Sequence, residues 1–188
     1  FVELWHELQG QSALELETCP KESYQSIQKF KTFSPPSQDR GFVFAQLSKN
    51  IENACMKARR YHLAAGGATC LLRTQDFRNA GLELRFTRPT AFSHEVIRAL
   101  RPIFDELFHS KDSYRSTGVV LFNLKNDDCI QLTLFDPPVQ IDKYQRVYRA
   151  VDDLRRRYGK HTVFLGSSFD AHAFTQHVGE RGDAPERK

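Results

Sequence analysis

A long apolar stripe within residues 41–63 constrains the fold of this chain more than any other sequence feature. Apolar side chains recur there at helical spacing, and polar or charged groups occupy the other side of the same helix. The stripe consists of Phe44, Leu47, Ile51, Ala54, Cys55 and Ala58. Ser37 and Asp39 are candidate N-caps, and we expect residues 64–67 to end the helix. A stripe of this length needs a broad apolar partner, such as one face of a sheet.

Strand-like segments and a second helical pattern flank the stripe. The clearest strand alternates Leu82, Leu84 and Phe86 with polar neighbours, as expected for a sheet with one buried face. Pro102 is expected to bend or interrupt the second helix. The strands are predicted at residues 26–33, 68–74, 82–86 and 117–124, and the second helix at residues 93–108. This βαββαβ order predicts an α+β fold, a four-stranded antiparallel sheet with two helices on one face, plus a C-terminal helix.

Composition and patterning divide the chain into five parts. The hydrophobic content of 40% suffices to bury a core in the sheet domain, which we place at residues 21–128. The chain begins at Phe1 inside a helical pattern, and we expect it to be a fragment of a longer protein. The other parts are the end of an upstream helix with a linker (1–20), an extended peptide (129–138), a helix with a short strand at 162–165 (139–169), and a disordered tail (170–188).

Basic residues are concentrated on the predicted sheet. The formal net charge is +4, which by itself is ordinary for a soluble protein. We expect the basic and hydroxyl groups of the strands to converge on the face that the helices leave bare, where they suit a duplex phosphate backbone. These residues are Lys29, Lys31, Arg73, Thr74, Arg78, Arg85, Thr87 and Arg88. The alternative is a solvated sheet face with ordinary edge lysines, and the pattern alone leaves both interpretations open.

Catalytic and metal-binding patterns are missing from the sequence. The acidic pairs fall on polar helix faces or in a turn, and they do not face one another as a two-metal site requires. They are Asp105-Glu106, Asp127-Asp128 and Asp152-Asp153. His172 and His177 lie in the tail without a cysteine pair, and the four cysteines have the wide spacing typical of reduced thiols. No apolar run approaches the roughly 20 residues that span a bilayer. We therefore expect no catalytic residue, no bound metal and no membrane partner.

Two short motifs have competing interpretations. Residues 40–44 resemble the aromatic strand motif of RNA-recognition domains, although their aromatic side chains run directly into the helical stripe. A single-strand binder of that type is therefore one alternative function. Residues 131–135 alternate polar and apolar groups before a second apolar side chain, so they fit either a peptide that docks in a hydrophobic pocket or a sheet-edge strand.

Several motifs, taken in order, resemble the C-terminal part of Y-family translesion DNA polymerases of the UmuC/DinB (DNA polymerase IV/V-like) branch. Residues 26–29, 44–49 and 117–119 are similar to segments of the little finger domain of that family. Residues 4–10 look like the end of the preceding thumb, and residues 157–162 resemble the closing segment of the branch. The resemblance covers about residues 1–169, and its weight lies in the order of the motifs.

This resemblance implies a non-catalytic fragment of an error-prone lesion-bypass polymerase. It implies that the fragment grips primer-template duplex DNA, with Lys29 and Arg85 at backbone-contacting positions. It also assigns Gln131, Leu132, Leu134 and Phe135 as anchors for the bacterial sliding clamp. The palm carboxylates, the Mg²⁺ ions and the nucleotide pocket belong to upstream palm, fingers and thumb domains. The expected setting is DNA repair and SOS damage tolerance at the bacterial nucleoid, in the cytoplasm. The alternative is a protein-interaction module that acts mainly through its clamp peptide.

Overall fold

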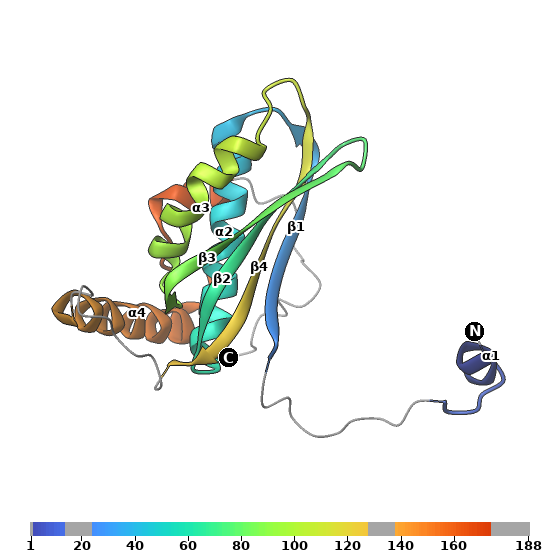
Figure 1. Ribbon diagram of the computed structural model, residues 1–188, viewed down its shortest axis with the longest axis horizontal. Helices are drawn as coiled ribbons and strands as arrows, with labels where there is room; N and C mark the ends of the chain where they lie inside the picture. The colour runs from blue at the N-terminus through green and yellow to red at the C-terminus, as the bar shows by residue number, and fades with distance from the viewer. Residues whose placement is uncertain (1, 14–23, 128–137, 174–188) are drawn as a thin grey trace.

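The computed structural model describes residues 2–13, 24–127 and 138–173. Its elements are α1 (Val2–Leu8), β1 (Ser26–Ser37), α2 (Arg40–Arg60), β2 (Leu63–Thr74), β3 (Asn79–Thr90), α3 (Ser93–Leu107), β4 (Tyr114–Asn126), α4 (Pro138–Tyr158), the 3₁₀ turn η2 (Gly166–Ser168) and α5 (Phe169–Ala173). The four strands form one antiparallel sheet in the order β1-β4-β2-β3. Helices α2 and α3 lie on the same side of this sheet (Figure 1). The predicted α+β architecture is confirmed.

The long helix α2 begins at a side-chain cap. The carboxylate of Asp39 accepts hydrogen bonds from two backbone N–H groups of the first turn, at 3.0 and 3.3 Å, as predicted for one of the two candidate caps. The predicted end of the helix is wrong, because α2 stops at Arg60 and residues 64–67 belong to β2. Small residues are required in the strand there, since a Cβ atom on Gly67 would lie 2.5 Å from the ring of Phe122.

Three prolines disturb the fold less than the sequence suggests. Strand β1 continues through Pro35 and Pro36 to Ser37, after an irregular register that begins at Thr32. Proline is tolerated there because β1 is an edge strand and needs fewer backbone N–H donors. Helix α3 likewise continues past Pro102, which is exposed, so of the predicted bend or interruption the interruption does not occur.

The core lies between the two helices and the sheet. Fully buried side chains come from α2 (Leu47, Ile51), α3 (Val96, Leu100, Phe104) and β4 (Val119, Leu121). Cys55 and Cys70 are free thiols in this core, and burial raises the pKa of Cys55 to about 11 and that of Cys70 to about 12. Both thiols therefore stay protonated and unreactive at neutral pH.

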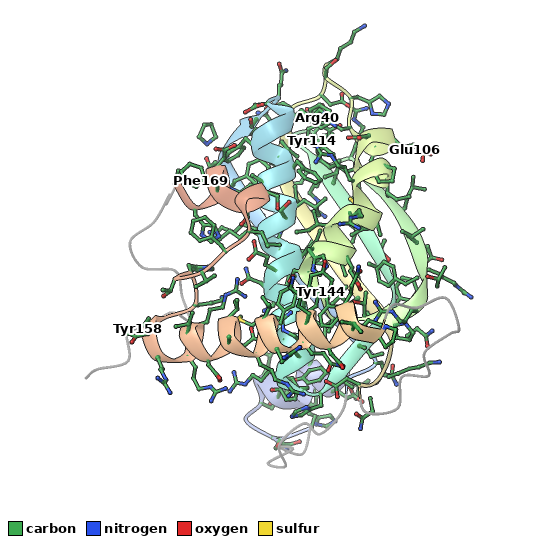
Figure 2. The ribbon with its side chains drawn as sticks, turned by 90° about the vertical axis from the view of Figure 1, so that its left-hand side faces the viewer. Arg40, Glu106, Tyr114, Tyr144, Tyr158 and Phe169 are labelled. Atoms are coloured by element: carbon green, nitrogen blue, oxygen red, sulfur yellow. The ribbon has the colours of Figure 1, made fainter. Side chains whose placement is uncertain are left out.

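The C-terminal helix α4 packs on the helical side of the domain, where it crosses α2 and α3 (Figure 2). Ile141 and Tyr148 are buried against Phe92. The guanidinium of Arg59 on α2 donates to both carboxylate oxygens of Asp152 on α4, at 2.7 and 2.8 Å. Burial by itself lowers the pKa of Arg59, but the hydrogen bonds and the charge of Asp152 outweigh it and hold that pKa above its ordinary value. A paired charge thus fixes α4 on α2.

A second charged contact fixes the segment that follows α4. The side chains of Glu52 and Arg155 are only 5% and 8% exposed, and their nearest oxygen and nitrogen lie 2.7 Å apart. Glu52 also accepts hydrogen bonds from the N–H of Leu165 at 3.2 Å and from the hydroxyl of Ser168. Arg155 donates to the carbonyl of Val163 at 2.9 Å. These backbone groups bond to side chains, so the strand predicted at residues 162–165 does not form.

The predicted tail begins too early, because residues 170–173 belong to the short helix α5. Figure 2 shows α5, with Phe169 labelled, beside the upper part of α2. The rest of that predicted tail lies outside the described residues. At the other end of the chain, α1 buries none of its residues. None of the helices in the described ranges is long and apolar enough to cross a membrane.

Candidate nucleic-acid interface

The strand register sorts the side chains of the sheet onto two faces. On one face Cys70 of β2 lies opposite Val119 of β4, and both are buried under α2 and α3. On the other face Thr69 lies opposite Val120, and both are partly exposed. Within the described ranges no helix covers this second face, which we call the open face (Figure 1). The open face consists of Ser26, Gln28, Phe30 and Thr32 on β1, Ser116, Gly118, Val120 and Phe122 on β4, Gly67, Thr69, Leu71 and Arg73 on β2, and Asn79, Gly81, Glu83 and Arg85 on β3.

The middle of the open face is apolar. Phe30, which is 53% exposed, lies against Gly118 of the neighbouring strand. Phe122 lies over Gly67 in the same way, because a Cβ atom at that glycine would come within 2.5 Å of the ring. The glycines let both rings lie close to the sheet, a cross-strand arrangement that stabilises glycine-containing strands. The centre of the face therefore offers rings and small groups rather than charges.

The charged groups of the open face stand toward its β2–β3 side. Arg73 and Arg85 are exposed and Glu83 lies between them along β3. Arg85 is opposite Gly67, six residues from Arg73 on β2, which separates the two arginines by roughly 20 Å along the strands. Thr87 is exposed two residues beyond Arg85. Widely spaced guanidinium groups of this kind can reach separate phosphates of one duplex.

The prediction that the lysines of β1 lie on the open face is wrong. Lys29 and Lys31 pair with Val119 and Thr117, which are buried beneath the helices, so both lysines extend from the helix-covered face at the sheet edge. Lys29 and Arg85 therefore lie on opposite faces. Burial lowers the pKa of Lys29, and the neighbouring charges of Lys160 and Lys57 lower it further. The physical reason is the alternation of β1, in which Ile27, Lys29, Lys31 and Phe33 share one side.

Three more of the predicted DNA-binding residues are engaged in contacts within the protein. The hydroxyl of Thr74, which is 8% exposed, accepts a hydrogen bond from the N–H of Arg78 at 3.2 Å. The guanidinium of Arg78 lies 3.1 Å from Asp112, and that of Arg88 lies 2.8 Å from Glu95. Arg88 is directed to the start of α3 by this ion pair. These contacts do not test DNA binding by Thr74, Arg78 and Arg88, which stays a prediction.

The structure describes one of the two short sequence motifs. Residues 40–44 form the first turn of α2, with Val43 and Phe44 buried, so they start the helical stripe as the sequence favours, and the alternative of an exposed aromatic strand is wrong. Residues 131–135, the predicted clamp-binding peptide with Gln131, Leu132, Leu134 and Phe135, lie outside the described residues.

The described side chains also include no group of three or more His, Cys, Asp or Glu residues that could hold a metal ion. His172 stacks on Phe164 with ring centroids 4.3 Å apart. Burial, with the charges of Lys49 and His161, lowers the pKa of His172 to about 4, so this side chain is neutral at pH 7. His177 lies outside the described residues. The Mg²⁺ ions implied by the family resemblance have no fitting ligand set in this part of the chain.

Sequence reasoning missed the aromatic residues of the open face. Ile27, Phe30 and Phe33 of the first strand are all apolar, so residue type alone does not separate the exposed Phe30 from the two buried residues. Strict alternation from Ile27 would have put Phe30 on the exposed side. The contact of Phe122 with Gly67 carries no such signal, because it depends on the pairing of β4 with β2.

The fold and the open face define a small α+β sheet domain with helices on one side and a solvent-facing sheet surface on the other. The impB/mucB/samB family C-terminal domain matches residues 24–134, more than half of the chain, and the chain therefore belongs to this family. The predicted identity as the C-terminal, little finger part of a Y-family DNA polymerase is confirmed at this level.

Individual relatives are distant. A DNA polymerase IV from Clostridium acetobutylicum is 22% identical over 121 residues, which cover 64% of this chain and 29% of that protein. The chain thus spans less than a third of the length of this relative. A little finger domain of PolIV, solved in complex with a beta-clamp processivity factor, is 17% identical with a TM-score of 0.43, covering 59% of this chain and 99% of that one. A DinB family error-prone DNA polymerase from Sulfolobus solfataricus is 16% identical with a TM-score of 0.48. The match covers 65% of this chain and 35% of that one.

Proposed function

We propose that this chain is the non-catalytic C-terminal part of a lesion-bypass DNA polymerase, and that it binds duplex DNA through the open face of its sheet. The observation that carries the proposal is the uncovered sheet surface with Arg73 and Arg85 about 20 Å apart and exposed hydroxyl groups beside them. Arginine contacts to phosphate supply affinity that is independent of base sequence. Such contacts tolerate a distorted template, which base-edge recognition would not.

The salt dependence of DNA binding tests this assignment. Each neutralised phosphate contributes about −0.9 to the slope of log K against log [salt]. We expect the double variant Arg73→Ala/Arg85→Ala to bind a duplex more weakly, with a slope reduced by about 1.8. The measurement is fluorescence anisotropy of a labelled duplex in a series of salt concentrations.

Lys29 provides the matched control, because Lys29→Ala removes one cation from the opposite face of the same sheet. If the open face holds the duplex, this variant keeps the slope of the wild type. A slope that falls for Lys29→Ala and not for the arginine pair would place the DNA on the helix-covered side and refute the proposal.

The second part of the proposal is clamp binding by residues 131–135. Its support is the sequence Gln-Leu-Thr-Leu-Phe, whose apolar side chains can act as anchors in a hydrophobic pocket. Buried apolar anchors are the residues that dominate such interfaces. Mg²⁺ and nucleotide chemistry belong, in this proposal, to the domains that precede the chain.

Truncating the two terminal anchors tests the clamp peptide. We expect Leu134→Ala/Phe135→Ala to weaken the affinity for a bacterial sliding clamp by roughly a hundredfold or more, as for central hot-spot residues. Val139→Ala is the control, since Val139 is an apolar side chain near the motif that is 78% exposed on α4. Isothermal titration with purified clamp gives both affinities. Equal clamp affinity in the double variant and the wild type would discard the peptide assignment.

The same titrations distinguish the alternative function, a protein-interaction module that acts mainly through its clamp peptide. The apolar centre of the open face favours this alternative, because Phe30 and Phe122 bring no charge to a phosphate backbone. Clamp binding without measurable duplex binding is the result expected for such a module.

A further inference from the structure

The turn between β2 and β3 presents an exposed aromatic ring in an unfavourable backbone conformation. Phe77 is 62% exposed and has a φ of 62°. A positive φ is a genuine outlier for a bulky residue, and for an L-residue it costs about 1–2 kcal/mol. Because most of the ring is exposed, the small apolar area that it buries offsets little of this conformational cost. Glycine or asparagine would fit this position without strain, so the presence of phenylalanine needs another explanation.

The turn holds Phe77 rigidly. The N–H of Phe77 donates to the carbonyl of Thr74 at 3.1 Å, and the N–H of Thr74 donates to the carbonyl of Arg78 at 3.0 Å. The N–H of Gln75 donates to the carbonyl of Ser113 at 2.7 Å, which ties the turn to the segment before β4. In Figure 1 the tip of this hairpin stands out to the right of β1 and β4. The backbone that carries the ring is therefore already ordered, so little backbone entropy is lost when a ligand packs on the ring.

Positive charge surrounds the ring. The guanidinium of Arg115 lies over the ring of Phe77, 4.5 Å from its centroid. Arg73, at the end of β2, donates to the neutral side chain of Asn79 at 2.7 Å. The ion pairs between described residues include neither Arg73 nor Arg115, whereas Arg78 is paired with Asp112 and Asp76. Two guanidinium groups thus remain available for phosphate beside the exposed ring.

We propose that Phe77 and Arg115 form a stacking site for an unpaired nucleobase, at the end of the β2–β3 hairpin next to the open face. A base stacks on the uncovered side of the Phe77 ring, while Arg115 and Arg73 contact the adjoining phosphates. An aromatic platform beside arginines is the combination by which proteins hold single-stranded nucleic acid without reading its sequence. The inference rests on the proposed duplex binding, since it places the single-stranded segment where a duplex leaves the open face.

The experiment compares two DNA ligands in anisotropy titrations with the 188-residue chain. One is a blunt duplex and the other is the same duplex with a short single-stranded overhang. We expect the wild type to prefer the overhang ligand by roughly fivefold to a hundredfold, the range given by one stacked base. Phe77→Asn should abolish this preference, leave the affinity for the blunt duplex unchanged, and unfold at a temperature no lower than the wild type, because asparagine tolerates positive φ.

Two further variants complete the test. Arg115→Lys keeps the charge but loses the planar stack on the ring, and it should reduce the preference for the overhang. Tyr158→Ala removes an aromatic side chain that is 70% exposed at the end of α4, and it should leave the preference unchanged. A preference that persists in Phe77→Asn, or is absent from the wild type, overturns the stacking site. If the wild type binds the blunt duplex without preferring the overhang, only this inference fails. If it binds no blunt duplex, the proposed function fails, and a Phe77-dependent binding of the overhang ligand would still support the stacking site.

Discussion

Replacing Glu52 by alanine is expected to release the C-terminal segment from the sheet domain. Glu52 is the shared acceptor for Arg155, Leu165 and Ser168, and its side chain is 5% exposed. Removing one partner of a buried ion pair leaves the other charge desolvated, which costs about 3–5 kcal/mol. The guanidinium of Arg155 recovers its hydration only if α4 moves away from α2. The loss therefore appears as local opening of α4 and of residues 163–168.

Hydrogen exchange measures this opening. We expect the amides of α4 to exchange at least about a hundredfold faster in Glu52→Ala, since each 1.4 kcal/mol is a factor of ten. The amides of β2 and β4 should keep their protection, because their hydrogen bonds lie within the sheet. Asp105→Ala is the matched control, as Asp105 pairs with Arg40 in solvent, with side-chain exposures of 44% and 50%. Surface pairs contribute about 0–1 kcal/mol. Unchanged exchange in α4 of the Glu52 variant would refute this view of how α4 is held.

Replacing Phe104 by alanine is expected to destabilise the whole sheet domain. Phe104 is fully buried in α3, and its ring centroid lies 5.0 Å from that of Phe44 on α2 and 5.5 Å from that of Phe108. The ring thus joins the two helices that cover the sheet. Truncation to alanine removes its apolar contacts and leaves a cavity, which costs about 3–5 kcal/mol. Denaturant unfolding followed by circular dichroism gives this value as a lowered transition midpoint.

Phe104→Leu serves as the graded comparison for this cavity. Leucine fills much of the same volume, so its expected loss is smaller than that of alanine. An alanine variant that loses no more than the leucine variant would show that the site collapses around the missing ring. In that case Phe104 does not determine how α2 and α3 pack together.

The local elements of this fold follow from the sequence because each has its own short-range signal. The apolar stripe of α2 has helical spacing, and the carboxylate of Asp39 precedes it by the distance that an N-cap requires. The alternation of Leu82, Leu84 and Phe86 places Arg85 on the opposite face of β3, as the structure confirms. These signals reach only a few residues, so they determine the type and order of the elements. The type and order in turn determine the α+β class.

The ends of elements and the faces of ambiguous strands were decided by tertiary contacts. The Ala-Ala-Gly-Gly segment looks like the end of a helix, but it belongs to β2 because the Phe122 ring needs the space over Gly67. In β1, Ile27 and Phe33 lie on one face and Phe30 on the other, so both faces carry an apolar side chain. The pairing of Lys29 with Val119 shows which of these faces the helices cover.

The candidate interface likewise depends partly on local sequence signals and partly on tertiary contacts. Arginine and threonine on strands were visible in the sequence, because residue type and alternation are local properties. Which of them share one surface was not visible, because it depends on which strands are neighbours and in which register, and only Arg73 and Arg85 of the predicted set lie on the open face. The contact of Glu52 with Arg155, 103 residues further along the chain, likewise exists only once α4 lies across α2. Contacts of that sequence separation have no short-range signal, and only the folded chain brings their partners together.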